Sequence, residues 1–266
     1  MATASPVYEE SGMSIGRVFQ RAFAAISLNP LVILGLALGV GALPSLVMTY
    51  GFYELGLSSP GSVRSSGIST SGLMGAMFIS SLIMFVISAL VQGALTRATV
   101  SANEGVRASF GESLASALRV VLPLIGLSIL WAFGLMIGFM LLIIPGIILL
   151  MMWAVAVPSL VVERRGIFAA FRRSSELTKG ARWKIFGLSL VLLVIYWLLS
   201  IVVGLVGLGL YNPATTPGLP ISNLIGSIIV GTIFNTLWGT IQPSLYVELR
   251  QWKEGTSAES LEDIFA

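Results

Sequence analysis

Residues 120–162 read VVLPLIGLSILWAFGLMIGFMLLIIPGIILLMMWAVAVPSLVV, a run of 43 residues without a charge. A helix rises about 1.5 Å per residue, so about 20 apolar residues cross the ~30 Å hydrocarbon core of a bilayer. The run is therefore long enough for two crossings. Pro145-Gly146 lies near its middle and is typical of a turn. The stretch predicts a transmembrane hairpin that turns at Pro145-Gly146.

Three further uncharged runs cover residues 22–53, 65–96 and 185–247. The first two fit one crossing each. The last fits two crossings, with a break from Tyr211 to Pro220 that contains three prolines. The sequence therefore predicts an all-α polytopic membrane protein with six transmembrane helices in three hairpins. The predicted spans are about 30–50, 73–96, 121–142, 146–162, 185–209 and 221–247.

The composition excludes a water-soluble globular domain. Of the 266 residues, 56% are apolar and 10% are charged, and the mean hydropathy is +0.94. Soluble domains contain about 45–50% apolar and about 25% charged residues. Because the charges gather in short clusters between the uncharged runs, we expect residues 1–266 to form a single integral membrane domain.

Two residue types are missing from the chain, cysteine and histidine. Without cysteine there are no disulfides, thiolate metal sites or cysteine nucleophiles. Without histidine the usual general base and the commonest ligand of transition metals are lost. We therefore expect no enzyme activity, no catalytic residues, no metal site and no cofactor.

The basic residues predict the orientation of the chain in the membrane. Six crossings put both termini on one side, together with the second and fourth loops. That side holds fourteen basic residues, and the other side holds Arg64 alone. This bias is a strong positive-inside signal, so we expect both termini to be cytoplasmic. The fourteen residues are Arg17, Arg21, Arg97, Arg107, Arg119, Arg164, Arg165, Arg172, Arg173, Lys179, Arg182, Lys184, Arg250 and Lys253.

A short amphipathic segment precedes each pair of crossings. In the first segment, Ile15 and Phe19 share a helical face, and Arg17 lies opposite. Such a helix suits the membrane interface, so we expect three units, each a cytoplasmic interfacial helix followed by a hairpin. The alternative is that any short helix leading into a membrane looks amphipathic. The segments are about 13–27, 108–119 and 164–180.

One part of the chain resembles a known family. The Pro145-Gly146 turn is followed by an apolar helix, by the sequence GIFAAFRRSSELT at 166–178, and by the basic-aromatic sequence GARWK at 180–184. This order is similar to the YciC-like bacterial inner-membrane proteins, which are related to the membrane domain of some glycerophosphodiester phosphodiesterases. The resemblance is closest over residues 143–187. It implies a bacterial inner-membrane protein with cytoplasmic termini and no well-defined activity, and it supplies no functional residue.

The fourth loop, from Glu163 to Lys184, holds seven basic and two acidic residues. Basic residues near a membrane surface attract anionic lipid head groups, at roughly 1 kcal/mol each. The loop therefore predicts contact with anionic head groups on the cytoplasmic leaflet, although the same charges could serve only to fix the topology. We expect no nucleic-acid partner. The basic residues are Arg164, Arg165, Arg172, Arg173, Lys179, Arg182 and Lys184.

The sixth predicted span carries a polar stripe on one helical face. Its side chains could line a cavity or a path for lipid head groups. The alternative is that they form hydrogen bonds between helices, each contributing about 0.6 kcal/mol. Separately, the small-residue pairs Gly35/Gly39 and Gly134/Gly138 predict close helix packing. The stripe consists of Thr232, Asn235, Thr236 and Gln242.

These observations favour a non-catalytic inner-membrane protein that acts in envelope or lipid homeostasis or as a membrane-embedded partner of other proteins, which the sequence does not name. A carrier or channel for a lipid-like or neutral solute is the alternative, since many transporters are built from repeated hairpins. No charged residue lies well inside a predicted span. This argues against an ion-coupled carrier, which usually needs a buried carboxylate.

Overall fold

The computed structural model describes residues 12–54, 70–210 and 221–255, and every regular element within these ranges is a helix. The all-α prediction is thus confirmed for the described part of the chain. The predicted break at 211–220 and most of the first predicted loop lie outside it. The helices are α1 (Ile15–Leu28), α2 (Pro30–Gly35), the π-helix η1 (Leu36–Ala42), α3 (Leu43–Glu54), α5 (Thr70–Asn103), α6 (Phe110–Arg119), α7 (Val121–Leu141), α8 (Ile143–Met152), α9 (Ala156–Glu163), α10 (Ile167–Thr178), α11 (Arg182–Leu210) and α12 (Ile221–Glu254).

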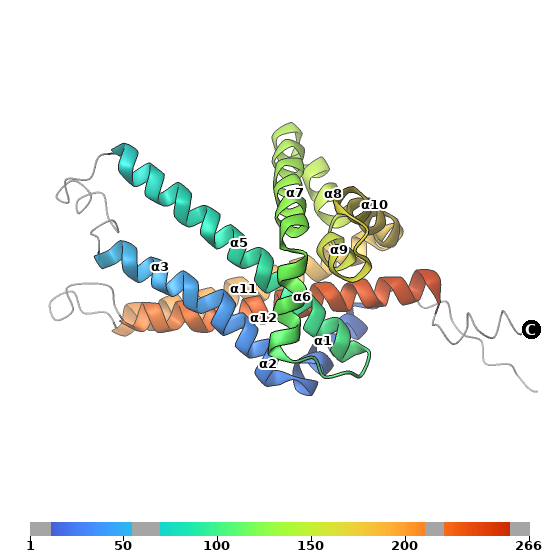
Figure 1. Cartoon of the computed structure of the whole chain (residues 1–266), viewed down its shortest axis with the longest axis horizontal. Helices are drawn as coiled ribbons and strands as arrows, with labels where there is room; N and C mark the ends of the chain where they lie inside the picture. Colours follow the sequence, from blue (N-terminus) through green and yellow to red (C-terminus); the bar gives the residue numbers. More distant parts are fainter. Residues whose placement is uncertain (1–11, 55–69, 211–220, 256–266) are drawn as a thin grey trace, which may run out of the picture.

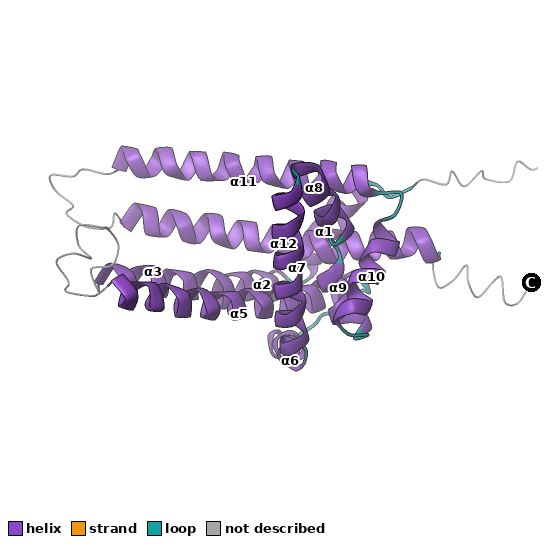
Figure 2. Cartoon of the chain, turned by 90° about the horizontal axis from the view of Figure 1, so that it is seen from above, coloured by secondary structure: helices purple, strands orange, loops and turns teal. Residues whose placement is uncertain are grey.

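The long helices α5, α11 and α12, together with the shorter α3, form the body of the molecule. Helices α3 and α11 end, and α5 and α12 begin, at the same end of the molecule (Figure 2). Helix α12 lies at the centre, in contact with α1, η1, α5 and α11. Helices α5 and α12 contain 34 residues each, about 51 Å at 1.5 Å per residue. Both are therefore longer than the ~30 Å hydrocarbon core and longer than the predicted spans 73–96 and 221–247.

Several of these helices are suited to a membrane. Four described segments are long and apolar enough to cross one: Ser71–Asn103, Val121–Leu141, Ile143–Glu163 and Arg182–Val206. A fifth is possible if α1 and the helix from Pro30 to Ala42, which meet at a bend of 93°, count as one span. In the most apolar windows of α5 and α11, only 11% and 6% of the residues are buried. Outward-facing apolar side chains of this kind need hydrocarbon around them, so the chain has the build of a multi-pass membrane protein.

The second predicted hairpin does not line up with the other two. Helices α7 and α8 stand across the direction of α11 and α12 (Figure 1). The turn between α7 and α8 therefore does not lie at the end where α11 ends and α12 begins. The structure confirms the helices of this hairpin but does not confirm six parallel spans. A long apolar run predicts a helix that is suited to a membrane. The direction of that helix depends on what it packs against.

The turn between α7 and α8 lies three residues before the predicted site. Leu142 is extended, with φ −166° and ψ 154°, and Pro145 and Gly146 belong to the first turn of α8. Proline is accommodated in a first turn because the N–H groups there have no helical partner. The predicted turn at Pro145-Gly146 is therefore wrong in position, although the hairpin itself is present.

Glycines bring α7 and α8 together. A Cβ atom added at Gly134 would lie 2.4 Å from Trp153, and one at Gly138 would lie 3.1 Å from the Cα of Gly146. This Gly134/Gly138 pair packs as predicted. The pair Gly35/Gly39 does not, because a Cβ at Gly39 would meet no described atom within 4 Å.

The predicted fourth span, 146–162, is two helices. Helix α8 ends at Met152 and α9 begins at Ala156. Ser174 of α10 bridges this break, because its hydroxyl donates to the carbonyl of Met152 (2.8 Å) and accepts from the N–H of Val155 (3.2 Å). Backbone groups freed by a break in an apolar helix need such partners. A polar residue of α10 thus has a structural role in α8 and α9.

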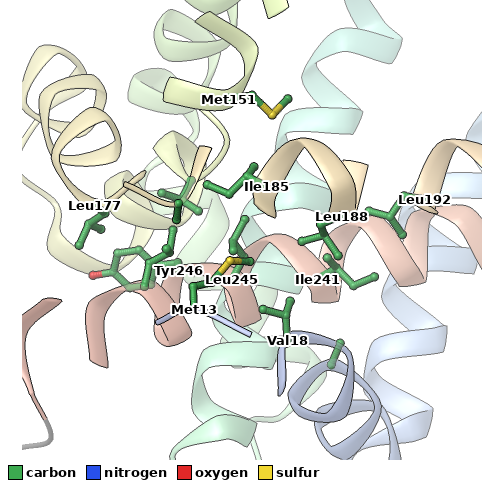
Figure 3. Packing of buried hydrophobic residues seen from close by; sticks show 14 residues of the cluster. Met13, Val18, Met151, Leu177, Ile185, Leu188, Leu192, Ile241, Leu245 and Tyr246 are labelled. Atoms are coloured by element: carbon green, nitrogen blue, oxygen red, sulfur yellow. The ribbon is translucent and has the colours of Figure 1, made fainter. Parts of the chain in front are cut away.

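The three amphipathic segments form helices α1, α6 and α10, close to their predicted bounds. Ser109 and Glu112 cap the start of α6 reciprocally, each side chain accepting from the other's backbone N–H. The face of α10 that is buried consists of Ala170, Ser174, Leu177 and Thr178. It packs on α7, α8, α9 and α12, so α10 is held by protein contacts on this face. Figure 3 shows the neighbouring core, where Met13, Val18, Leu177, Ile185, Ile241 and Tyr246 meet from five segments.

Candidate functional site

A cavity of about 480 Å³ lies where the crosswise hairpin meets the long helices. Its walls come from η1, α5, α7, the region of the α8–α9 break, and α12. It lies near the middle of α5 and of α12. We call it the chamber. Its volume falls within the ~300–1,000 Å³ typical of small-molecule sites.

Neutral polar side chains line the chamber, most of them on the wall formed by α5 and α12. The side-chain amide of Gln92 donates to the side-chain oxygen of Gln242 over 2.5 Å. An amide carries two donors and two acceptor lone pairs, so each glutamine keeps capacity for a further partner. None of the described residues lining the chamber is charged. The polar residues are Ser88, Gln92, Ser128, Asn235 and Gln242.

The remaining wall is aromatic and aliphatic. Three indole rings, of Trp131, Trp153 and Trp238, border the chamber. No local sequence pattern marks these tryptophans or Gln92 as site residues, because their positions in the chain are far apart. The only local sign of a role for Gln92 is that a polar amide lies within the apolar run of α5.

The π-helix η1 also contributes to the chamber. Gly41, within η1, lies so close to Asn235 that an added Cβ would be 3.2 Å from the amide nitrogen. π-Helical turns often occur at functional sites. The glycine lets the first long helical region approach the polar face of α12.

The structure divides the predicted polar stripe. Asn235 and Gln242 line the chamber, whereas Thr232 and Thr236 are not among its lining residues. The hydroxyls of both threonines are buried and have no hydrogen-bond partner among the described residues. The neighbouring Thr240 hydroxyl donates to the carbonyl of Thr236 over 2.7 Å. The stripe therefore contains two chamber residues and two threonines that belong to the packed interior.

A buried carboxylate holds α1 against α12. Glu248 is only 3% exposed, and its carboxylate accepts from Nε of Arg17 at 2.6 Å and pairs with Nε of Arg21 at 3.2 Å. The backbone N–H of Ser14 donates to the same group over 3.3 Å. Glu248 therefore ties the start of the described chain to the last helix.

A second carboxylate joins α9, α10 and α12. Glu163 accepts from Nε of Arg173 at 2.7 Å and from the hydroxyl of Tyr246 at 2.9 Å. Arg173 also pairs with Glu254. Burial alone would lower the pKa of Arg173, but its bonds to both carboxylates raise that pKa above the ordinary value. Arg173 is thus a structural cation, and it is only 21% exposed.

The other basic residues of the fourth loop are spread over several environments. Arg172 is exposed and pairs with Glu176 one turn later at 3.2 Å, and Lys179 is exposed. Arg165 is exposed and lies 3.5 Å from Glu163. Nζ of Lys184 donates to the carbonyl of Met13 over 2.9 Å.

Two further arginines of the loop have particular surroundings. Arg164 ends α9 in the left-handed conformation (φ 52°), with an exposed side chain. Nε of Arg182 is buried without a hydrogen-bond partner in the described part of the chain. The seven basic residues therefore do not form one continuous surface, and Arg173 in particular is turned inward.

Comparison with known proteins identifies one family. Residues 13–249 match a domain of unknown function (DUF7847). No curated protein and no solved structure matches the chain. The match runs from α1 to Leu249 in α12, and so includes the chamber and the carboxylates of Glu163 and Glu248. The chain belongs to the DUF7847 family.

Proposed function

We propose that this protein is a non-catalytic membrane protein that binds lipid-like molecules in the chamber, with a role in envelope or lipid homeostasis. The observation that carries the proposal is the chamber's lining of indole rings and neutral amides. Such a lining accepts an apolar body and hydrogen-bonds an uncharged polar group. The described residues of this lining offer no counterion for a charged head group.

The ionisable groups support a non-catalytic role. The carboxylates of Glu163 and Glu248 are engaged by arginines, so both have structural partners. The chain has no histidine or cysteine to act as a base or nucleophile. The polar groups of the chamber, which are amides and hydroxyls, are binding groups.

A carrier for a lipid-like or neutral solute is the second candidate. The chamber lies at the meeting point of helices from all three predicted hairpins. Binding sites of carriers built from repeats lie in a comparable position, near the middle of the membrane between repeats. The crosswise hairpin α7–α8 forms one wall, so a change in its direction would open or close the chamber.

Lipid retention tests the proposed binding. We expect native mass spectrometry of the purified chain in mild detergent to show retained lipid, and Ser88→Phe to reduce retention severalfold because the ring fills the chamber. Ser81→Phe is the matched control, since Ser81 is exposed on the same helix and is not among the chamber-lining residues. Equal retention by both variants would contradict binding in the chamber.

The exposed basic residues are proposed to contact anionic head groups on the cytoplasmic leaflet. In the same experiment, replacing Arg165, Arg172 and Lys179 with glutamine should reduce co-purified anionic lipid and leave neutral lipid unchanged. Arg173 is left intact because its partners are Glu163 and Glu254. If the amount of co-purified anionic lipid were unchanged, these basic residues would serve only to fix the topology.

We further propose that the protein resides in a bacterial inner membrane with six crossings and both termini in the cytoplasm. The support is the resemblance of residues 143–187 to YciC-like proteins and the gathering of basic residues on one side. A reporter that is active only in the cytoplasm should be active after Arg107 or Lys179. It should be silent at Ser66, Leu142 or Thr215. Activity at Leu142 would mean that α7 and α8 do not cross, and activity at Thr215 would contradict the orientation.

A further inference from the structure

Two smaller cavities extend the chamber toward the outer surface. A cavity of about 280 Å³, which we call the groove, lies between α8, α11 and α12. A narrow cavity of about 70 Å³ lies between the groove and the chamber. It shares Trp153 and Gln242 with the chamber and Leu150 and Leu192 with the groove. The three cavities therefore adjoin one another in a row.

The groove differs from the chamber in its chemistry. Apart from Ser189, Tyr196 and Trp238, its described lining residues are aliphatic side chains, methionine and phenylalanine. Leu190 and Leu193 on its rim are half exposed. The groove thus opens on the apolar outer face of α11, where hydrocarbon surrounds a membrane protein.

Trp238 lies at the boundary, because it lines all three cavities. Its ring stacks on Phe234 with the ring centroids 6.0 Å apart. The ring centroids of Phe234 and Tyr196 are 4.8 Å apart. These rings form an aromatic wall from the groove to the chamber. One turn after Trp238, Gln242 presents its amide to the chamber. The row of cavities therefore changes from apolar to polar at Trp238.

We propose that the chamber and the groove together bind one single-chain amphiphile with an uncharged head group that bears hydroxyl or amide groups. The head group lies among Gln92, Asn235 and Gln242, and the hydrocarbon chain passes Trp238 into the groove. This inference rests on the proposed lipid binding and names its ligand class.

Two features select this class. The head group is uncharged because a charge buried without a counterion is costly, and the described chamber residues supply none. The ligand has one chain because the cavity that connects the chamber to the groove has a volume of only about 70 Å³. A monoacylglycerol has this chemistry.

Photo-crosslinking of the full chain in mild detergent tests the placement. Two monooleoylglycerol probes carry a diazirine, one at the head group and one at the end of the chain. We expect the head probe to label the chamber segments 88–92, 128–132 and 235–242, and the chain probe to label 147–151 and 189–196. Unlabelled monooleoylglycerol should compete, whereas lysophosphatidylglycerol and dodecane should compete at least tenfold less well.

Variants separate the two ends of the site. The double substitution Gln92→Leu with Gln242→Leu should weaken binding of the probes roughly tenfold, since two hydrogen-bonding amides are lost. Trp238→Ala should widen the connection, so that dioleoylglycerol competes as well as monooleoylglycerol. The matched control is Trp197→Ala, because Trp197 is exposed on α11 and lines none of the three cavities.

The outcomes distinguish this inference from the proposed function. If the head probe labels the chamber but the chain probe labels the exposed faces of α5 and α11 evenly, lipid binding stands and the single-chain site is wrong. The same holds if the glutamine variant binds normally or if lysophosphatidylglycerol competes equally. If neither probe labels the chamber, and Ser88→Phe also retains normal lipid, the proposed function itself is wrong.

Discussion

Replacing Glu248 with alanine is expected to destabilise the protein by about 3 kcal/mol, because Arg17 and Arg21 lose the buried carboxylate that pairs with both. Breaking a fully buried pair costs about 3–5 kcal/mol. The lower end applies because the arginines are 41% and 26% exposed and retain contact with water. Thermal unfolding in mild detergent, followed by size-exclusion chromatography, should show a drop of roughly 6–12 °C.

The position of α1 supplies a second measurement for this variant. Because Glu248 also accepts from the N–H of Ser14, its loss should free α1 from α12 and make trypsin cleavage after Arg17 and Arg21 faster. The matched control is Glu176→Ala, which removes an exposed pair with Arg172 worth under about 0.5 kcal/mol. Similar unfolding temperatures for the two variants would mean that Glu248 does not hold the helices together.

Replacing Gly239 with leucine is expected to separate α12 from α5 at the centre of the bundle. A Cβ at Gly239 would lie 2.3 Å from Cδ1 of Leu95 and 3.0 Å from its Cβ. The Cδ1 atom can rotate away, but the Cβ is fixed to the backbone of α5. Overpacking of this kind costs about 1–3 kcal/mol, and we expect at least the upper value. The measurement is the unfolding temperature in detergent together with the yield of monodisperse protein.

Gly231→Leu is the control for this substitution. Gly231 lies in the same helix, and a Cβ there would meet no described atom within 4 Å. Leucine is a better helix former than glycine, which is about 0.8–1 kcal/mol less favourable than alanine, so this variant should be as stable as the parent or slightly more stable. A loss of stability at both positions would indicate that leucine disturbs α12 itself and that the contact with Leu95 is not the cause.

The uncharged runs determined most of the secondary structure. In hydrocarbon a backbone must satisfy its own hydrogen bonds, so a long apolar run without charges has few alternatives to a helix. This is why α7 and α11 lie close to their predicted ranges. The three amphipathic helices also lie close to theirs, because an apolar face at helical spacing opposite a charged face predicts a helix. Because the helix itself was predictable, the spacing of Gly134 and Gly138 was enough to predict a close helix contact, although it did not indicate the partner helix.

Local turn positions were less well determined. Pro145-Gly146 is a strong turn signal, yet proline also fits the first turn of a helix, and the structure uses it there after Leu142. The break between α8 and α9 likewise lies just before a proline, because Pro158 belongs to the first turn of α9. It is stabilised by Ser174, a residue of another helix, whose hydroxyl bonds Met152 and Val155.

Contacts between distant residues were decided by the tertiary structure alone. Helical periodicity places Arg172 and Arg173 next to each other, but only packing against Glu163 and Glu254 turns Arg173 inward. Likewise Asn235 and Gln242 were visible as a polar stripe, whereas their neighbours Gln92 and Trp131 come from other helices. The sequence by itself determined which segments are helical and apolar and where the charges gather, because those properties depend on residues near one another in the chain. The direction of α7 and α8, the partners of the charges and the chamber depend on side-chain packing between helices, which no local pattern encodes.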